Sequence, residues 1–246
     1  MSDPASIFSI DGVPVAFEPG QSILEAALAN GIFIPHLCWH ADFPAHASCK
    51  LCTVIVNGRN GSACTIKAAP GLDVLSATPD LAERRRTLLQ MLFVEGNHFC
   101  PGCEKSGDCK LQAHAYEAGM LDPHFNQFFP NRPLDGSHPD ILLDLNRCIM
   151  CELCVRASRD IDGKSVFGLS GRGLASHIVV NSASGRLGDT DLTLDDRAAH
   201  ICPVGAILIK RVGFAVPIGS RTFDKGEISE LGLDLGVAAP IQEAGE

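Results

Sequence analysis

Closely spaced cysteines are the residues of this 246-residue chain best suited to chemistry, and there are eleven of them. The first group follows the pattern Cys38-x10-Cys49-x2-Cys52-x11-Cys64. Four thiolates satisfy the two irons of a [2Fe–2S] cluster, two per iron. We expect the close Cys-x-x-Cys pair to form one wall of the site. The small residues Ala47 and Ser48 should let backbone N–H groups approach the cluster, which tunes its potential.

Two other kinds of site accept part of this first group. A Cys₄ zinc site also takes four thiolates. A Rieske centre needs two histidines, and Cys38-Trp39-His40 offers half of such a motif. The other half is absent, because Cys52 stands where the second histidine is needed. We expect the histidines near this group to be loop and surface residues rather than ligands: His36, His40 and His46.

The second group is Cys100-x2-Cys103-x5-Cys109, which is one ligand short of a [4Fe–4S] cluster. His98 is the nearest imidazole, and His114 lies five residues beyond the last cysteine. An imidazole in place of a thiolate removes negative charge and should raise the reduction potential. The missing fourth cysteine therefore predicts His98 as a ligand, with His114 as the alternative.

The third group is Cys148-x2-Cys151-x2-Cys154, followed by Cys202-Pro203. A run of this kind with a remote Cys-Pro is typical of bacterial ferredoxins. Here Cys202 has no run of its own, so one [4Fe–4S] cluster takes all four cysteines. Zinc ribbons use separated pairs instead, which this spacing does not offer.

The three groups together use every cysteine in the chain. An odd number of cysteines with repeated Cys-x-x-Cys pairs does not suit a framework of disulfides. The sequence therefore predicts one [2Fe–2S] and two [4Fe–4S] clusters.

The segments around the first group predict a β-grasp unit in residues 1–78. Apolar runs at 7–10 and 13–17 flank Asp11-Gly12, which favours a two-residue hairpin turn. Ser22 and Glu25 form a capping box that begins a helix ending near Gly31. A cysteine-rich loop and two further strands, the first at residues 53–56, complete the unit.

The remaining segments complete an α+β organisation with three cluster domains. Helices are predicted from Pro79 to Gly96 and over residues 110–120, and strands at 177–181 and 192–194. The predicted parts are a β-grasp [2Fe–2S] ferredoxin domain at 1–78, a small helical His-Cys₃ [4Fe–4S] domain at 79–121, a linker at 122–140, a bacterial-ferredoxin-like [4Fe–4S] domain at 141–213 and an extended C-terminal tail at 214–246.

Composition excludes several other classes of protein. The chain is 46% hydrophobic, carries a formal charge of −9 and has no basic run, so we expect no nucleic-acid partner. Residues 1–10 lack a secretory signal, and no apolar stretch approaches the roughly 20 residues that span a bilayer. Reduced cysteines without an export signal predict a cytoplasmic protein.

The motifs resemble the N-terminal iron–sulfur region of the large peripheral subunit of respiratory complex I, which also occurs in [FeFe] hydrogenases. The resemblance covers residues 5–213. The residues that carry it are Ile34-Pro35-His36-Leu37-Cys38, Ser48-Cys49-Lys50-Leu51-Cys52, Ala63-Cys64, the run Cys100-Pro101-Gly102-Cys103-Glu104-Lys105-Ser106-Gly107-Asp108-Cys109-Lys110-Leu111-Gln112, Cys148-Ile149-Met150-Cys151-Glu152-Leu153-Cys154, and Ile201-Cys202-Pro203-Val204-Gly205-Ala206. One departure is that this family places three residues between the ligand histidine and the first cysteine, whereas only Phe99 stands there here.

The length of the chain and its lack of nucleotide-binding motifs narrow the set of relatives that it resembles. Those relatives continue into a long catalytic domain, whereas this chain stops about 40 residues after its last cysteine. It has no P-loop, and Gly168-x2-Gly171-x-Gly173 is not a dinucleotide-binding fingerprint. We therefore expect no catalytic residue and no substrate site. The chain also resembles the small diaphorase subunits of cytoplasmic NAD-reducing [NiFe] hydrogenases, a likeness that extends into residues 212–219.

This resemblance implies an electron-transfer subunit between a [NiFe] hydrogenase module, with its small and large subunits, and a flavin-bearing diaphorase subunit that reduces NAD. FMN, NAD and the NiFe centre would then belong to the partners. Two alternatives remain. One is the same relay in an NAD-linked formate dehydrogenase or a complex I-type NADH dehydrogenase. The other is a zinc-stabilised scaffold with no redox role.

Overall fold

Residues 6–122 and 124–233 are described by a computed structural model, and their contacts divide the chain into two compact units. Unit 1 comprises Met1–Ala82 and Gly226–Glu246, and unit 2 comprises Glu83–Lys225. Short strands and helices occur in both units, which confirms the α+β class. The end of the predicted tail, residues 234–246, lies outside the described residues.

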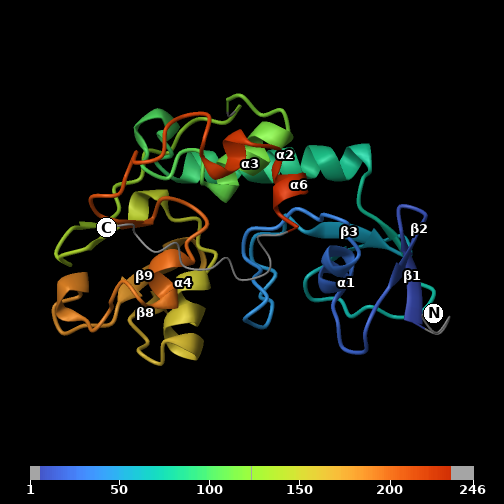
Figure 1. The fold of residues 1–246 in the computed structure, drawn as a ribbon, viewed down its shortest axis with the longest axis horizontal. Helices are drawn as coiled ribbons and strands as arrows, with labels where there is room; N and C mark the ends of the chain where they lie inside the picture. The colour runs from blue at the N-terminus through green and yellow to red at the C-terminus, as the bar shows by residue number, and fades with distance from the viewer. Residues whose placement is uncertain (1–5, 123, 234–246) are drawn as a thin grey trace. The chain divides into compact units, whose positions relative to one another are not determined.

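Unit 1 is built on a five-stranded mixed sheet with the order β2-β1-β5-β3-β4 (Figure 1). Its strands are β1 (Ile7–Ile10), β2 (Val13–Ala16), β3 (Thr53–Val56), β4 (Arg59–Ser62) and β5 (Asp73–Leu75). The β1–β5 pair is parallel, and the other three pairs are antiparallel. Asp11 and Gly12 have φ values of 50° and 79°, as the predicted hairpin turn requires.

Helix α1 (Ile23–Ala29) packs on this sheet and helps to position the first cysteine group. The predicted capping box is present, since Ser22 and Glu25 bond each other's backbone N–H groups. At the start of the helix, the Ile23 and Leu24 N–H groups donate to Ile66 O at 2.9 Å and Ala63 O at 3.0 Å. These bonds attach α1 to the chain on both sides of Cys64.

Unit 2 combines a small sheet, a hairpin and short helices (Figure 1). The sheet has the order β10-β7-β6, from β6 (Leu134–Asp135), β7 (Ile141–Asp144) and β10 (Ile207–Ile209), and the hairpin is β8 (Phe167–Ser170) with β9 (His177–Val180). The α-helices of unit 2 are α2 (Pro79–Glu95), α3 (Lys110–Glu117), α4 (Leu153–Arg156) and α5 (Arg197–His200). Helix α2 begins in the last residues of unit 1, and α6 (Ile228–Leu231) belongs to unit 1. A π-helical turn spans Ala157–Ile161, and 3₁₀ turns span Cys100–Gly102, Leu145–Arg147, Gly173–Ala175, Leu187–Asp189 and Thr222–Asp224.

Two segments of unit 2 differ from their predicted local structure. The prediction of a strand at 192–194 is wrong. The backbone of this segment forms hydrogen bonds with side chains and not with a neighbouring strand. His138 Nε2 lies 2.8 Å from Leu192 O, and Asp196 Oδ2 accepts from Thr193 N at 2.7 Å. The segment 122–140, predicted as a linker, contributes the edge strand β6, which pairs with β7.

None of the helices within the described ranges combines the length and the apolar character that crossing a membrane requires.

Replacing Ser22 with Ala should destabilise unit 1 by about 1 kcal/mol, because the cap of α1 loses its side-chain bond. The loss should appear as a lower urea midpoint and as faster release of the first cluster, since α1 is attached beside Cys64. Ser170, an exposed serine on β8, provides the matched Ser→Ala control. Equal midpoints for the two variants would contradict this role of the cap.

Candidate metal centres

The first cysteine group lies in unit 1, on the loop between α1 and β3 and directly after β4. Cys52 Sγ lies 3.4 Å from Cys64 Sγ, and Cys49 N donates to Cys38 Sγ at 3.5 Å. The Cys38 and Cys49 thiols also bond each other, which lowers the pKa of Cys38. The sulfurs therefore pair as Cys38 with Cys49 and Cys52 with Cys64.

The loop that carries this group turns its backbone toward the sulfurs. Ala47 and Lys50 have φ values of 53° and 57°, in the left-handed region that non-glycine residues adopt rarely. The Ser48 backbone bonds the Cys38 sulfur, and the Ala47 backbone bonds that of Cys64. These bonds match the expectation that small residues before Cys49 let N–H groups reach the site. Two thiolate pairs with N–H donors suit a site for two irons.

The second group forms a cavity in unit 2 between the end of α2 and the start of α3. His98, Cys100, Cys103 and Cys109 all line it, together with Phe93, Ser106, Leu111, Gln112, Arg147 and Gly205. Burial raises the pKa of the Cys109 thiol to about 12. His114, the alternative ligand, is buried on α3 and is not part of this lining.

The His98 ring has the state that a metal ligand needs. Its Nε2 atom is buried and has no hydrogen-bond partner. The ring packs on Phe93 with 5.3 Å between centroids and interacts with the Leu92 backbone. Burial, with the positive charges of Arg147 and Arg132, lowers the pKa of His98 to about 4. The imidazole is therefore neutral near pH 7, and a buried polar atom without a partner calls for a bound ligand.

Two glycines and a glutamine shape this second cavity. A Cβ atom on Gly96 would lie 2.5 Å from His98 Nε2, so only glycine leaves room for the ring. A Cβ atom on Gly205 would lie 2.8 Å from Cys103 Sγ. Gln112 Oε1 accepts from Gly107 N at 2.8 Å and holds the loop between Cys103 and Cys109 in place.

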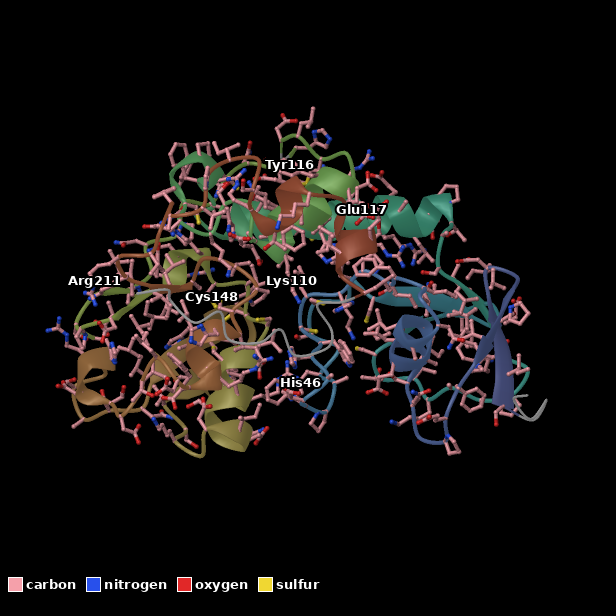
Figure 2. The ribbon with its side chains drawn as sticks, in the orientation of Figure 1. His46, Lys110, Tyr116, Glu117, Cys148 and Arg211 are labelled. Carbon is pink, nitrogen blue, oxygen red and sulfur yellow. The ribbon has the colours of Figure 1, made fainter. Side chains whose placement is uncertain are left out.

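The third group lines a cavity of its own, and all four cysteines face it: Cys148, Cys151, Cys154 and Cys202. Figure 2 labels Cys148. Met150 and Glu152 have φ values of 55° and 58°, and Met150 N donates to Cys148 Sγ at 3.4 Å. Burial raises the pKa of Cys148 to about 11 and raises the pKa values of Cys151 and Cys154 further.

The second and third cavities share a wall of polypeptide. Gly205, three residues after Cys202, packs against Cys103 Sγ, and Pro203 O accepts from Lys110 N at 2.9 Å. Arg147, directly before Cys148, lines the second cavity. The polypeptide that holds one group thus also encloses the other.

The donor sets suit clusters spread over a cavity. All eleven cysteines are free thiols. Within residues 6–122 and 124–233, no three His, Cys, Asp or Glu side chains converge on a point where a single ion would sit. The thiols instead line cavities or form pairs, and His98, whose Nε2 is buried, joins one of these linings. The residues present fit iron–sulfur clusters.

Sequence reasoning missed four residues that shape these centres: Gly96, Gln112, Arg147 and Gly205. Gly96 was expected only to end a helix, Gln112 and Gly205 stand in the motifs of the family resemblance without an assigned role, and Arg147 directly precedes Cys148. The position of Arg147 next to Cys148 and that of Gly205 after Cys202-Pro203 were the signals available in the sequence.

Three family models together match most of the chain. The "2Fe-2S iron-sulfur cluster binding domain" matches residues 6–79. The "NADH-ubiquinone oxidoreductase-G iron-sulfur binding region" matches residues 85–124, and the "4Fe-4S single cluster domain" matches residues 141–209. One [2Fe–2S] region and two further cluster-binding regions therefore occur in the predicted order.

Individual relatives include subunits of hydrogenases and of NADH oxidoreductases. The gamma subunit of the NAD-reducing hydrogenase HoxS of Cupriavidus necator is 41% identical over 88% of this chain and 92% of its own length. A chain of the "Crystal structure of NAD+-reducing [NiFe]-hydrogenase in the H2-reduced state" is 54% identical with a TM-score of 0.91, over 94% of this chain and 99% of that one. An NADH-quinone oxidoreductase subunit of Rhizobium meliloti is 33% identical over 81% of this chain, which spans 23% of that relative.

Replacing His98 with Ala should remove one [4Fe–4S] cluster or change its EPR signal, because the second cavity loses its fourth donor. The wild-type chain should hold about ten iron atoms with matching sulfide, and a lost cluster lowers this number by about four. His114→Ala is the matched control and should keep the wild-type iron content and spectrum. An unchanged spectrum in His98→Ala would contradict this ligand, and colourless wild-type protein with zinc would contradict all three clusters.

Proposed function

Because the chain belongs to the family of gamma subunits of NAD-reducing hydrogenases, we propose that it relays electrons between a [NiFe] hydrogenase module and a flavin-bearing module that reduces NAD. The observation that carries this proposal is the match over nearly the full length of both chains, combined with three separate cysteine-lined sites. Clusters at these sites would supply the one-electron chemistry, and the protein's task is to hold and tune them.

The proposal assigns every cysteine and one histidine to a cluster. The [2Fe–2S] ligands are Cys38, Cys49, Cys52 and Cys64, the second centre takes His98, Cys100, Cys103 and Cys109 as a [4Fe–4S] cluster, and the third takes Cys148, Cys151, Cys154 and Cys202. The buried, unpartnered Nε2 of His98 supports its place beside the three cysteines of the second centre. The lining of the third cavity by all four cysteines supports that assignment.

The proposed partners are the flavin- and NAD-binding diaphorase subunit and the small and large subunits of the hydrogenase. They would carry FMN, NAD and the NiFe centre, and this chain would contribute no substrate site of its own. A reducing, cytoplasmic location is part of the proposal, because eleven free thiols stay available for iron only where they are kept reduced.

A second candidate is the same relay serving a complex I-type NADH dehydrogenase. The 33% identity to the NADH-quinone oxidoreductase relative favours it. That relative is about four times longer than the segment matched, since this chain spans 23% of it. The coverage of the HoxS relative at 92% of its length supports the hydrogenase assembly instead.

Purification of the assembly through this chain tests the proposal. We expect a nickel-bearing subunit and a flavin-bearing subunit to co-purify, and the complex to reduce NAD with H₂. Cys151→Ser should lower the rate of NAD reduction by H₂ at least tenfold, because a thiolate of the third cluster is lost. Reduction of a dye by NADH at the flavin partner, and by H₂ at the nickel partner, should continue as controls. Co-purification of a quinone reductase without nickel would support the second candidate.

A further inference from the structure

Arg147 connects the two [4Fe–4S] centres proposed for unit 2. Its backbone directly precedes Cys148, the first proposed ligand of the third centre. Its side chain lines the cavity of the second centre instead. There Nη1 donates to Cys103 Sγ at 3.4 Å. A fixed positive charge and an N–H donor are thus directed at one proposed cluster ligand.

The guanidinium is held in this position from two further sides. Nη1 also donates to Glu104 Oε2 at 2.9 Å, and Nε forms an ion pair with Asp144 Oδ2 at 2.9 Å. The side chain is 18% exposed, and its stem packs beside Gly205. The two carboxylates hold the guanidinium of Arg147 in one orientation, so that its bond to the Cys103 sulfur does not depend on a mobile side chain.

The lining of the third cavity differs in charge. Apart from the four cysteines it is formed by apolar side chains with Glu152 as its one charged member among the described residues, and no arginine or lysine contributes. The second cavity contains Arg147, Ser106 and Gln112 besides its ligands. Arg132 and Lys110 interact with Cys148 and Cys151 from outside this lining. What the second centre has in addition is an arginine bond to a ligand sulfur, and such bonds help to set the potential of an iron–sulfur cluster.

We propose that Arg147 is a positioning residue that raises the reduction potential of the second [4Fe–4S] centre through its bond to the Cys103 thiolate. Reduction adds one negative charge to the cluster, and the adjacent guanidinium stabilises that charge. This inference rests on the ligand assignment of the proposed function. Alternatively, Arg147 only links Glu104 to Asp144 and has no effect on the reduction potential. The experiment must separate these two roles.

The test is an EPR-monitored redox titration of the purified assembly with four variants. The signal that changes in His98→Ala identifies the second centre, and the third centre serves as an internal reference. At the wild-type midpoint, Arg147→Gln should lower the ratio of reduced to oxidised second centre about tenfold, equivalent to about 59 mV for a one-electron couple. Arg159→Gln removes a charge from an exposed ion pair outside both cavities and should leave the ratio unchanged.

Glu104→Gln separates tuning from structure. It removes the carboxylate that shares Nη1 with Cys103, so the ratio should rise, opposite in sign to Arg147→Gln. The inference would be overturned if the ratio changed in the same direction in both variants. It would also be overturned if the ratio were unchanged in Arg147→Gln protein that holds its second cluster. If Arg147→Gln loses the second cluster, Glu104→Gln decides alone, and an unchanged ratio refutes tuning. Wild-type protein without two cubane signals would refute the proposed function itself.

Discussion

The burial of thiols is the constraint on which unit 2 depends. A thiol must lose its proton to bind a metal, and burial opposes that loss, as the raised pKa values of Cys109 and Cys148 show. Metal binding offsets this cost and couples to folding. Several buried apolar residues of unit 2 line the third cavity, among them Leu143, Val204 and Ile207. The cluster site is therefore part of the hydrophobic core of unit 2.

Unit 1 also buries cysteines of its site, beside a core with a larger sheet. Its core is formed by the sheet and α1, with residues such as Ile10, Ile23 and Val54 completely or almost completely buried. The cysteines lie on a loop outside the regular elements, and strained backbone at Ala47 and Lys50 directs N–H groups to the sulfurs. Left-handed non-glycine residues each cost about 1–2 kcal/mol, a strain that persists only where the surroundings hold it. The core and the site therefore share residues, since Cys52 and Cys64 belong to the buried core cluster.

Local patterns predicted the parts of the structure that depend on neighbours in sequence. The capping box at Ser22, the Asp11-Gly12 turn and the cysteine groups are all short-range features. Long-range pairing was not visible in this way, which is why the parallel β1–β5 pair was not anticipated and the strand at 192–194 was wrong. Arg147 was missed for the same reason, since its partner Cys103 is 44 residues away.

The order of the segments in unit 2 explains why its two cubane sites belong together. The chain supplies residues 98–109 to the second site, then 148–154 to the third, and returns with 202–205, where Cys202 faces the third cavity and Gly205 lines the second. The Lys110 N–H bond to Pro203 O closes this arrangement. Neither wall is complete until the last segment is in place. A short polypeptide path between two redox centres follows from this interleaving, and so does the ability of one side chain beside Cys148 to act on its neighbour.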